Sequence, residues 1–384
     1  MIKIQVDNIE QVKDQYFDQI KGFILKRVNF YLMAFRIIDK QAGVSIDDIV
    51  KLGGMHISTK KAYLKLLVKN PKAFRKKDNI SRLVLKNSIL PHFYVNRAGY
   101  IALLEELSIE VTLKKLILAE VDDMLTLKRY YSRTWFNIET VKLLKTIFSY
   151  EDFADKKTVP FNAYHLSSLL NVNVCVYCNR IYTNTVIGSG NSCIIRPTFD
   201  HFFSQSSAPI LALSFYNLIP SCTFCNSNLK GAKEVNLVDH LHPYLEGFGN
   251  DAQFDYIQVA YHQDRSDPRN YFIYIRKNLN TTHPKYKRVF GDGKDDVGNV
   301  ELFKLEEVYK SHADVVGELV VKMDKLSSIH SDNIVKMVAS IGASRQDFYR
   351  YYFSNYPEAK DFIKRPLAKL TNDIVAKYCP LVLE

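Results

Sequence analysis

The sequence predicts an α+β fold in which a β-rich, cysteine-bearing middle lies between two mostly α-helical regions. Three observations support this prediction. Apolar residues recur at helical spacing through the first 150 residues, short β-rich runs begin near residue 171, and helical patterns return after residue 300. The chain of 384 residues is long enough for two or three units. We therefore expect three regions, which are residues 1–150, 151–265 and 266–384.

The first region is predicted to be helical. One long amphipathic helix is expected over residues 8–40, because apolar side chains recur there at helical spacing. These are Val12, Tyr16, Ile20, Ile24 and Val28. Residues 45–69 contain a helix, a Gly-Gly turn and a second helix, which resemble a helix-turn-helix DNA reader, although any two packed helices joined in this way look alike. The basic loop 69–79 that follows could contact phosphates or could simply be solvated.

The positive charge of the chain is concentrated in the same region. Residues 1–150 hold 26 Lys and Arg and 15 Asp and Glu, whereas residues 151–384 hold 26 of each kind, so the first region carries the whole net charge of +11. A basic surface attracts polyanions by releasing their counterions. Nucleic acid is therefore an expected partner of the first region, and the solvated helix faces of a basic protein are the alternative.

The composition is that of a globular protein, because 47% of the residues are hydrophobic and 24% are charged. No run of about 18 apolar residues occurs, so we expect no membrane-spanning helix. The first residues lack the apolar segment of a signal peptide, and the predicted location is cytoplasmic. In a reducing compartment, closely spaced cysteines predict metal ligands rather than disulfides.

Four of the six cysteines form two Cys-x-x-Cys pairs, which predict a structural zinc site. The first cysteine pair is Cys175 and Cys178, the second is Cys222 and Cys225, and 43 residues lie between the pairs. Two such pairs can supply four thiolates in a tetrahedron, which is the geometry that Zn²⁺ prefers. Coincidence or a redox pair are the alternatives. The two remaining cysteines are expected to be inert, small apolar residues: Cys193 and Cys379.

Strands are predicted around the first cysteine pair and beyond residue 250. The runs NRIYTNTVIG (179–188) and CIIRPTFDHFF (193–203) are separated by SGNS and predict a hairpin. The run YFIYIRKNL (271–279) predicts another strand. Four helices are expected in the last region, with Pro366 in the first turn of the fourth: 301–326, 331–342, 344–356 and 366–378.

Polar residues between and beside the cysteine pairs suit metal-assisted hydrolysis. Cleavage of a phosphodiester needs a deprotonated water and a divalent cation that neutralises the phosphate and the leaving oxygen. A neutral imidazole, His201, can act as the general base. Asp200 and the side-chain carbonyl of Asn226 offer the oxygen ligands that Mg²⁺ prefers. Asp200 and His201 are adjacent, so a regular strand would point them to opposite faces, and the sequence leaves this tension open.

The segment DHF…SFYNLIPSCTFCNSNLKG, preceded by CVYCNR, resembles the HNH, or ββα-metal, endonuclease family in its zinc-bound form. The resemblance covers roughly residues 172–250. It implies a ββα-metal core in which His201 is the general base on the first strand and Asp200 is a metal ligand. It also implies that Asn217 ties the loop and helps to hold the histidine. Asn226 would be the last metal ligand, where Asn replaces the His of the family name.

The same resemblance implies two kinds of metal, a structural Zn²⁺ on the four cysteines and a catalytic Mg²⁺ or Mn²⁺. The neighbouring run DHLHPYLEGF (239–248) is similar to bacterial HNH proteins associated with defence against phage, such as the HNH subunit of Septu-type systems. That narrower similarity implies a partner protein of a defence system.

Several further side chains are candidates for contact with the substrate. Arg180 and Arg196 flank the predicted hairpin, and His242 alternates with His240, so the two histidines would share one face of a strand. Lys230 follows Asn226 after three residues, where relatives often have two, which weakens the prediction of a phosphate contact. These relatives also often carry a basic run after Asp-His, which FFSQSS lacks here. Asn228 is a rival of Asn226 for the catalytic metal.

These observations predict a metal-dependent HNH endonuclease that hydrolyses phosphodiester bonds, with DNA as the expected substrate. The alternative is a non-catalytic zinc-ribbon protein that binds nucleic acid or acts as an adaptor. Such a protein would need the cysteines and the basic charge but not Asp200, His201 and Asn226. An RNA-cleaving version of the same site is a third interpretation, because no feature of the sequence indicates whether the protein distinguishes RNA from DNA by the ribose 2′-hydroxyl.

Overall fold

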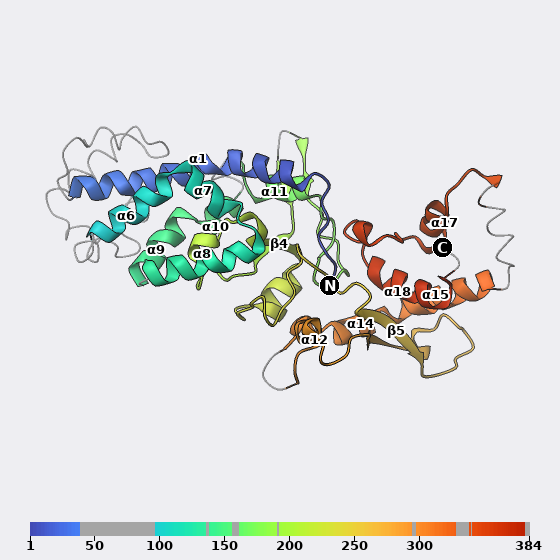
Figure 1. The fold of residues 1–384 in the computed structure, drawn as a ribbon. Coiled ribbons are helices and arrows are strands. Elements are labelled where there is room, and N and C mark those ends of the chain that lie inside the picture. Colours follow the sequence, from blue (N-terminus) through green and yellow to red (C-terminus); the bar gives the residue numbers. More distant parts are fainter. Residues whose placement is uncertain are drawn as a thin grey trace. The chain divides into compact units, whose positions relative to one another are not determined.

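The computed structural model describes residues 1–38, 97–135, 138–155, 161–189, 192–293, 297–327, 338 and 340–380. The fold is mixed α+β, as predicted, with many helices and small two-stranded sheets (Figure 1). The helix-turn-helix-like segment 45–69, the basic loop 69–79 and most of the expected helix 331–342 lie outside the described residues. None of the described helices is both long and apolar enough to cross a bilayer.

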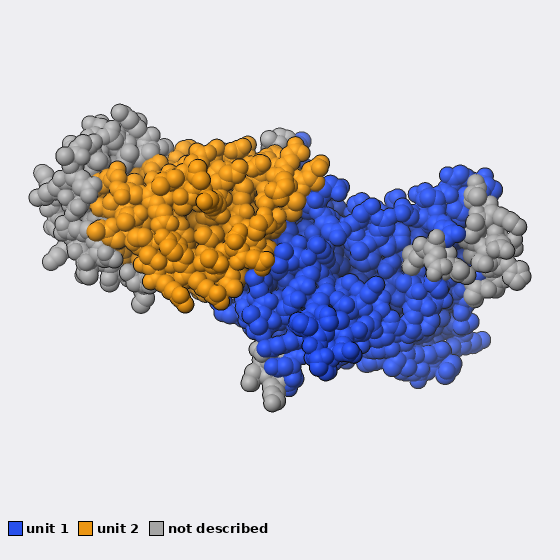
Figure 2. Space-filling view, in the orientation of Figure 1, with its two compact units in different colours: residues 1–7, 170–202, 219–384 blue, residues 8–169, 203–218 orange. Residues whose placement is uncertain are grey.

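The chain divides into two compact units, which Figure 2 colours separately. Unit 1 consists of residues 1–7, 170–202 and 219–384, and unit 2 consists of residues 8–169 and 203–218. Neither unit is one continuous stretch of the chain. The units therefore group the residues differently from the three regions expected from the sequence, since most of the first region lies in unit 2 and most of the other two lies in unit 1.

Unit 2 is built on the long helix α1 (Ile9–Ile38), which confirms the helix predicted from the apolar spacing. Tyr16, Ile20, Ile24 and Val28 are buried, so the predicted apolar stripe faces the core. Helix α6 packs along α1 (Figure 1). The described helices of the unit after α1 are α6 (Arg97–Ser108), α7 (Glu110–Ile117), α8 (Val121–Thr134), α9 (Ile138–Ile147), α10 (Tyr150–Ala154) and α11 (Ala163–Leu170).

The segment 203–218 completes the core of unit 2. It contains two 3₁₀ turns, η2 (Pro209–Leu211) and η3 (Phe215–Asn217). The Tyr16 hydroxyl donates to the Leu213 carbonyl at 2.8 Å, and the Ser214 hydroxyl donates to the Leu116 carbonyl at 2.8 Å. These bonds satisfy polar groups that would otherwise be costly to bury.

Unit 1 contains three two-stranded sheets within the described residues. Strand β1 (Val186–Ile187) pairs antiparallel with β2 (Cys193–Ile195), which confirms the predicted hairpin. Strand β3 (Thr198–His201) pairs with β4 (Leu218–Ser221), and β5 (Ala252–Gln258) pairs antiparallel with β6 (Tyr271–Lys277), the strand expected from YFIYIRKNL.

The expectation of one continuous strand over residues 193–203 is wrong. The run forms two strands, β2 and β3, which belong to different sheets and are separated by Arg196 and Pro197. Proline has no N–H to donate to a strand ladder, so pairing stops there. This break allows β3 to leave the hairpin and pair with β4, where the Thr198 hydroxyl donates to the Ser221 carbonyl at 2.8 Å.

The helices of unit 1 follow the predicted pattern with two corrections and one addition, the helix α12 (Pro284–Phe290), which overlaps a run expected to be a loop, residues 287–300. The expected helix 301–326 is broken at Lys304, whose φ of 46° lies in the left-handed region and ends a helical turn. Pro366 precedes the last helix rather than opening it, because Leu367 is also left-handed, at φ 59°. The described helices are α12 (Pro284–Phe290), α13 (Asn299–Leu302), α14 (Leu305–Tyr309), α15 (Ala313–Ser327), α17 (Arg345–Phe353) and α18 (Ala368–Tyr378).

Candidate metal centre and catalytic residues

The four paired cysteines converge in one buried cluster of unit 1. Their Sγ atoms all lie within 4.8 Å of one another, and each residue is at most 5% exposed. Tetrahedral zinc with Zn–S bonds of about 2.3 Å would place its sulfurs about 3.8 Å apart, so the cluster could hold a zinc ion. In the part of the chain that the structure describes, no other group of three or more His, Cys, Asp or Glu side chains is arranged to hold a metal.

Backbone turns hold each cysteine pair. In the first pair, the N–H of Asn179 donates to the Cys175 carbonyl at 2.7 Å, and Asn179 adopts the left-handed φ of 51° that asparagine tolerates. The Asn179 side chain accepts a bond from the N–H of Lys369 at 3.0 Å, which anchors the turn to the start of α18. In the second pair, the N–H of Cys225 donates to Cys222 Sγ at 3.4 Å.

The thiols of the cluster perturb one another's ionisation. Hydrogen bonds with the neighbouring cysteines lower the pKa of Cys178 and the pKa of Cys222. Burial raises the pKa of the Cys175 thiol well above its ordinary value, because a thiolate there would lose its hydration. A divalent ion supplies the positive charge that lets coordinating thiols deprotonate. The site is therefore chemically suited to a metal that takes sulfur ligands, as the spacing predicts.

Strand β3 carries Asp200 and His201, and both are buried, with exposed fractions of 2% and 8%. Successive side chains of a strand point to opposite faces, but neither of these two side chains faces open solvent. Asp200 Oδ2 accepts a hydrogen bond from the Tyr177 hydroxyl at 2.6 Å, and Oδ1 accepts one from Lys230 Nζ at 2.7 Å. Lys230 Nζ also donates to the His201 carbonyl at 2.8 Å.

Tyr177 is a residue of the site that the sequence did not reveal. It lies between Cys175 and Cys178, so spacing alone marked it as a spacer in the first cysteine pair. Its bond with Asp200 joins residues 23 positions apart, and no local pattern signals such a contact. The aromatic residue inside a metal-binding pair was the available signal, because a buried tyrosine hydroxyl usually has a hydrogen-bond partner.

Asn217 lies directly before β4 and is fully buried in unit 2. Its Oδ1 accepts the N–H of Phe203 at 2.7 Å. Its Nδ2 donates to the carbonyls of Phe203 at 3.1 Å and Leu211 at 2.9 Å. One side chain thus ties together the two ends of the segment between the strands β3 and β4.

Substituting Asn217→Ala is expected to lower the free energy of unfolding by about 2–4 kcal/mol, because it leaves a buried N–H and two carbonyls without these bonds. Urea denaturation measures this loss of stability as a lower midpoint urea concentration, while the slope of the unfolding free energy against urea concentration stays constant. The exposed Asn228 provides the control, since Asn228→Ala should change stability by less than about 0.5 kcal/mol. Equal stability of the two variants would show that the segment does not depend on this tie.

Asn226 lies in η4 (Phe224–Lys230), a π-helix that follows β4 and contains the end of the second cysteine pair. The residue is half-buried, and its Nδ2 donates to the Phe199 carbonyl at 3.4 Å, next to Asp200. This bond holds the amide of Asn226 beside β3. Asn228, its rival for the catalytic metal, is exposed.

The other predicted substrate contacts lie as follows. Arg180 Nη1 donates to the Val308 carbonyl at 2.6 Å, and Arg196 Nη1 donates to the Pro197 carbonyl at 2.7 Å. His242 is buried, with its ring centroid 4.4 Å from that of Phe202. These contacts are internal to unit 1, and contact of any of the three residues with a substrate stays a prediction.

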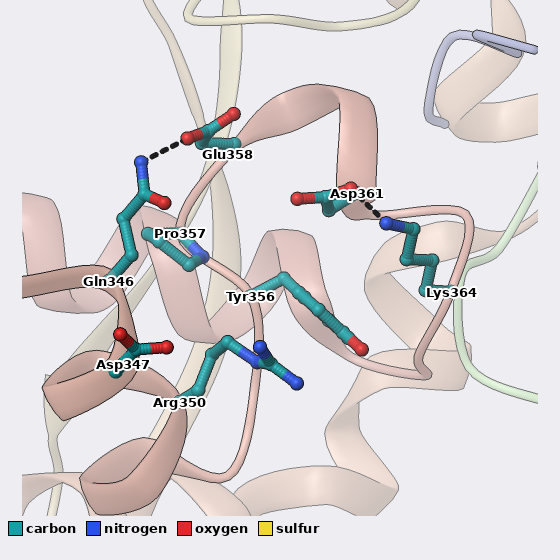
Figure 3. Close-up of a pocket in the computed structure, with 8 residues that line it drawn as sticks. All are labelled: Gln346, Asp347, Arg350, Tyr356, Pro357, Glu358, Asp361 and Lys364. Atoms are coloured by element: carbon teal, nitrogen blue, oxygen red, sulfur yellow. Dashed lines mark hydrogen bonds and ion pairs between the residues drawn. The ribbon is translucent and has the colours of Figure 1, made fainter. Parts of the chain in front are cut away.

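A small polar pocket of about 120 Å³ lies in unit 1 and contains none of the predicted site residues (Figure 3). Some of its polar side chains contact one another. Asp361 pairs with Lys364 at 2.6 Å, and Gln346 donates to Glu358. The full lining is Gln346, Asp347, Arg350, Tyr356, Pro357, Glu358, Asp361 and Lys364.

Protein-family models, curated proteins and solved structures give no match to this chain. The resemblance to the HNH family therefore rests on the motif residues alone. Within unit 1, the structure shows the buried four-cysteine cluster, strand β3 with Asp200 and His201, and η4 with Asn226.

Proposed function

We propose that this protein is a metal-dependent endonuclease of the HNH type that hydrolyses phosphodiester bonds, with DNA as its substrate. The observation that carries the proposal is the order of elements around the cysteine cluster. His201 ends β3, Asn217 directly precedes β4, and Asn226 lies in the helical segment η4. The resemblance implies the same order, in which the histidine lies on the first strand of the ribbon and the last ligand on the helix.

The chemical roles follow from the donor atoms. The imidazole of His201 accepts a proton from the attacking water, which general-base catalysis requires. Asp200 and Asn226 provide oxygen atoms suited to Mg²⁺ or Mn²⁺. Such an ion, when bound, would neutralise charge on the phosphate and the leaving oxygen. An ionised carboxylate has about four lone-pair sites, so Asp200 can bind a metal while it keeps its bonds with Tyr177 and Lys230.

In this proposal the zinc ion is structural. Cys175, Cys178, Cys222 and Cys225 provide a closed set of four ligands, which leaves no open position for substrate or water. Zinc bound there would hold both cysteine pairs, and with them the turn that follows Cys178 and the start of η4. The cluster would therefore support the catalytic residues and take no part in the chemistry.

The basic region near the N-terminus provides the expected contact with nucleic acid. Residues 39–96 hold 12 Lys and Arg and 4 Asp and Glu, so most of the net charge of the chain belongs to a segment outside the described residues. Binding through phosphates would weaken steeply with added salt. A role in defence against phage, with a partner protein, rests on the narrower resemblance of residues 239–248.

Purified protein is expected to nick or linearise supercoiled plasmid in the presence of Mg²⁺ or Mn²⁺ and to leave it intact in excess chelator. Agarose electrophoresis at low salt measures the conversion. Asp200→Asn is the matched variant and should cut far more slowly, because the amide lacks the negative charge with which the carboxylate attracts the divalent cation. Cleavage of RNA alone would change the substrate. Intact DNA and RNA with both metals, despite binding, would favour the non-catalytic zinc module.

A further inference from the structure

Two hydrogen-bond donors contact the carboxylate of Asp200. One lies inside the first cysteine pair, and the other lies five residues after the second pair. We infer that Tyr177 and Lys230 are positioning residues that fix Asp200 for binding of the catalytic divalent cation. The inference rests on the proposed function. It adds Tyr177 to the site, gives Lys230 a different role from the predicted phosphate contact, and provides a physical connection between the cysteine cluster and the catalytic residues.

The first donor comes from inside the first cysteine pair. Tyr177 lies between Cys175 and Cys178, and its hydroxyl donates to Asp200 Oδ2 at 2.6 Å. Its ring stacks on Phe303, with centroids 4.2 Å apart and planes 19° apart, so the hydroxyl has little freedom to turn away. A metal held by Cys175 and Cys178 would therefore also fix the position of this donor.

The second donor follows the second cysteine pair. Lys230 ends the π-helix η4, in which Cys225 is the second residue. Positions five apart in an α-helix point about 140° apart, whereas the wider turn of a π-helix, with its i to i+5 bonds, brings them closer to one face. The N–H of Gly231 makes such a bond to the Asn226 carbonyl at 2.8 Å. This geometry lets Lys230 reach Asp200 from a helix that begins at the cysteine cluster.

The two donors act on different atoms of Asp200, which is why they orient it. Tyr177 holds Oδ2 and Lys230 holds Oδ1, so the plane of the carboxylate is set by two bonds from separate parts of the chain. The side chains of Lys230 and Asp200 are both nearly inaccessible, at 4% and 3% exposure. A buried carboxylate requires such a counter-charge, and hydrogen-bond partners of a metal-binding carboxylate typically affect metal affinity.

The chain offers a matched control for the tyrosine. Tyr309 is also buried, and its hydroxyl donates to the Cys178 carbonyl at 2.6 Å. Removing either hydroxyl therefore deletes one buried bond at the first cysteine pair. Only the hydroxyl of Tyr177 reaches Asp200, so the difference between Tyr177→Phe and Tyr309→Phe isolates the effect on that carboxylate.

The test is a calorimetric Mn²⁺ titration of zinc-loaded, full-length protein in four forms: wild type, Tyr177→Phe, Tyr309→Phe and Asp200→Asn. We expect Tyr177→Phe to weaken Mn²⁺ binding about tenfold or more while it keeps its zinc and its melting temperature close to that of Tyr309→Phe. Tyr309→Phe should bind Mn²⁺ within about twofold of wild type. Zinc content and thermal unfolding are measured on the same samples, so a general loss of structure is visible.

The remaining outcomes overturn the inference in distinguishable ways. If Tyr177→Phe binds Mn²⁺ like wild type while Asp200→Asn does not, the metal site stands and the positioning role is wrong. If both tyrosine variants lose affinity equally, the effect belongs to the cysteine pair in general and not to Asp200. If wild type binds no Mn²⁺, or Asp200→Asn binds it equally well, the proposed catalytic metal site itself fails, and the inference fails with it.

Discussion

Substituting Cys222→Ser is expected to abolish stable zinc binding and to unfold the part of unit 1 that surrounds the cysteine cluster. Structural zinc contributes an apparent binding free energy of about 10–16 kcal/mol in small zinc modules, and most of that energy is energy of folding. A serine hydroxyl cannot replace a thiolate ligand, and the three remaining cysteines are buried together, where they would lack a cation. Metal analysis for zinc and thermal unfolding followed by circular dichroism measure the two effects.

The control for this experiment is Cys193→Ser. Cys193 is also a buried cysteine of unit 1, but it lies outside the cluster, in β2. Its replacement should leave one zinc ion per chain and cost no more than an ordinary substitution of a small buried residue, about 1 kcal/mol. A Cys222→Ser protein that keeps its zinc and its native melting temperature would contradict the proposal that the zinc is structural.

Substituting His201→Ala is expected to lower the rate of plasmid cleavage by about 10²–10⁴-fold, the usual contribution of a general base. The zinc content should not change, because no cysteine of the cluster is altered. The loss should appear in the rate of the chemical step, measured with enzyme in excess over plasmid, and not in the affinity for DNA. Removing the imidazole leaves the backbone bond between the His201 carbonyl and Lys230 in place.

His165→Ala is a suitable comparison for that variant. His165 is a half-buried histidine of unit 2, where its ring stacks on Phe161 and contacts Asn162, and it has no assigned role in the site. Cleavage by His165→Ala should match wild type. If His201→Ala cuts the plasmid at the same rate as His165→Ala, then His201 is not the base.

Those features of the fold that depend on local periodicity could be predicted from the sequence. Helix α1 was predictable because a 3.6-residue period of apolar side chains is visible without knowledge of the partner. The cysteine cluster was predictable for a different reason, since two cysteines separated by two residues commonly serve as metal ligands. Both predictions rest on chemistry that the surrounding chain does not alter.

Contacts between distant residues could not be predicted in this way. Strand β5 carries Asp255, a charge that argues against a buried strand, yet the carboxylate is fully buried. It is stabilised by Lys377 and by the hydroxyls of Tyr378 and Tyr274, two of which lie over 100 positions away. The sequence predicts Lys230 only as a phosphate contact. Its bond with Asp200 joins residues 30 positions apart, and no local pattern signals such a contact.

The path of the chain also sets the order in which the two units can be completed as the protein is synthesised. Residues 8–169 emerge first, but the acceptor for the Tyr16 hydroxyl is Leu213, so unit 2 stays unfinished until the ribosome has passed residue 218. Residues 1–7 wait longer, because the N–H of Ile4 bonds to the carbonyl of Pro243. Both units therefore remain incomplete while residues 170–218 are synthesised. Strand β3, with Asp200 and His201, is made during that interval.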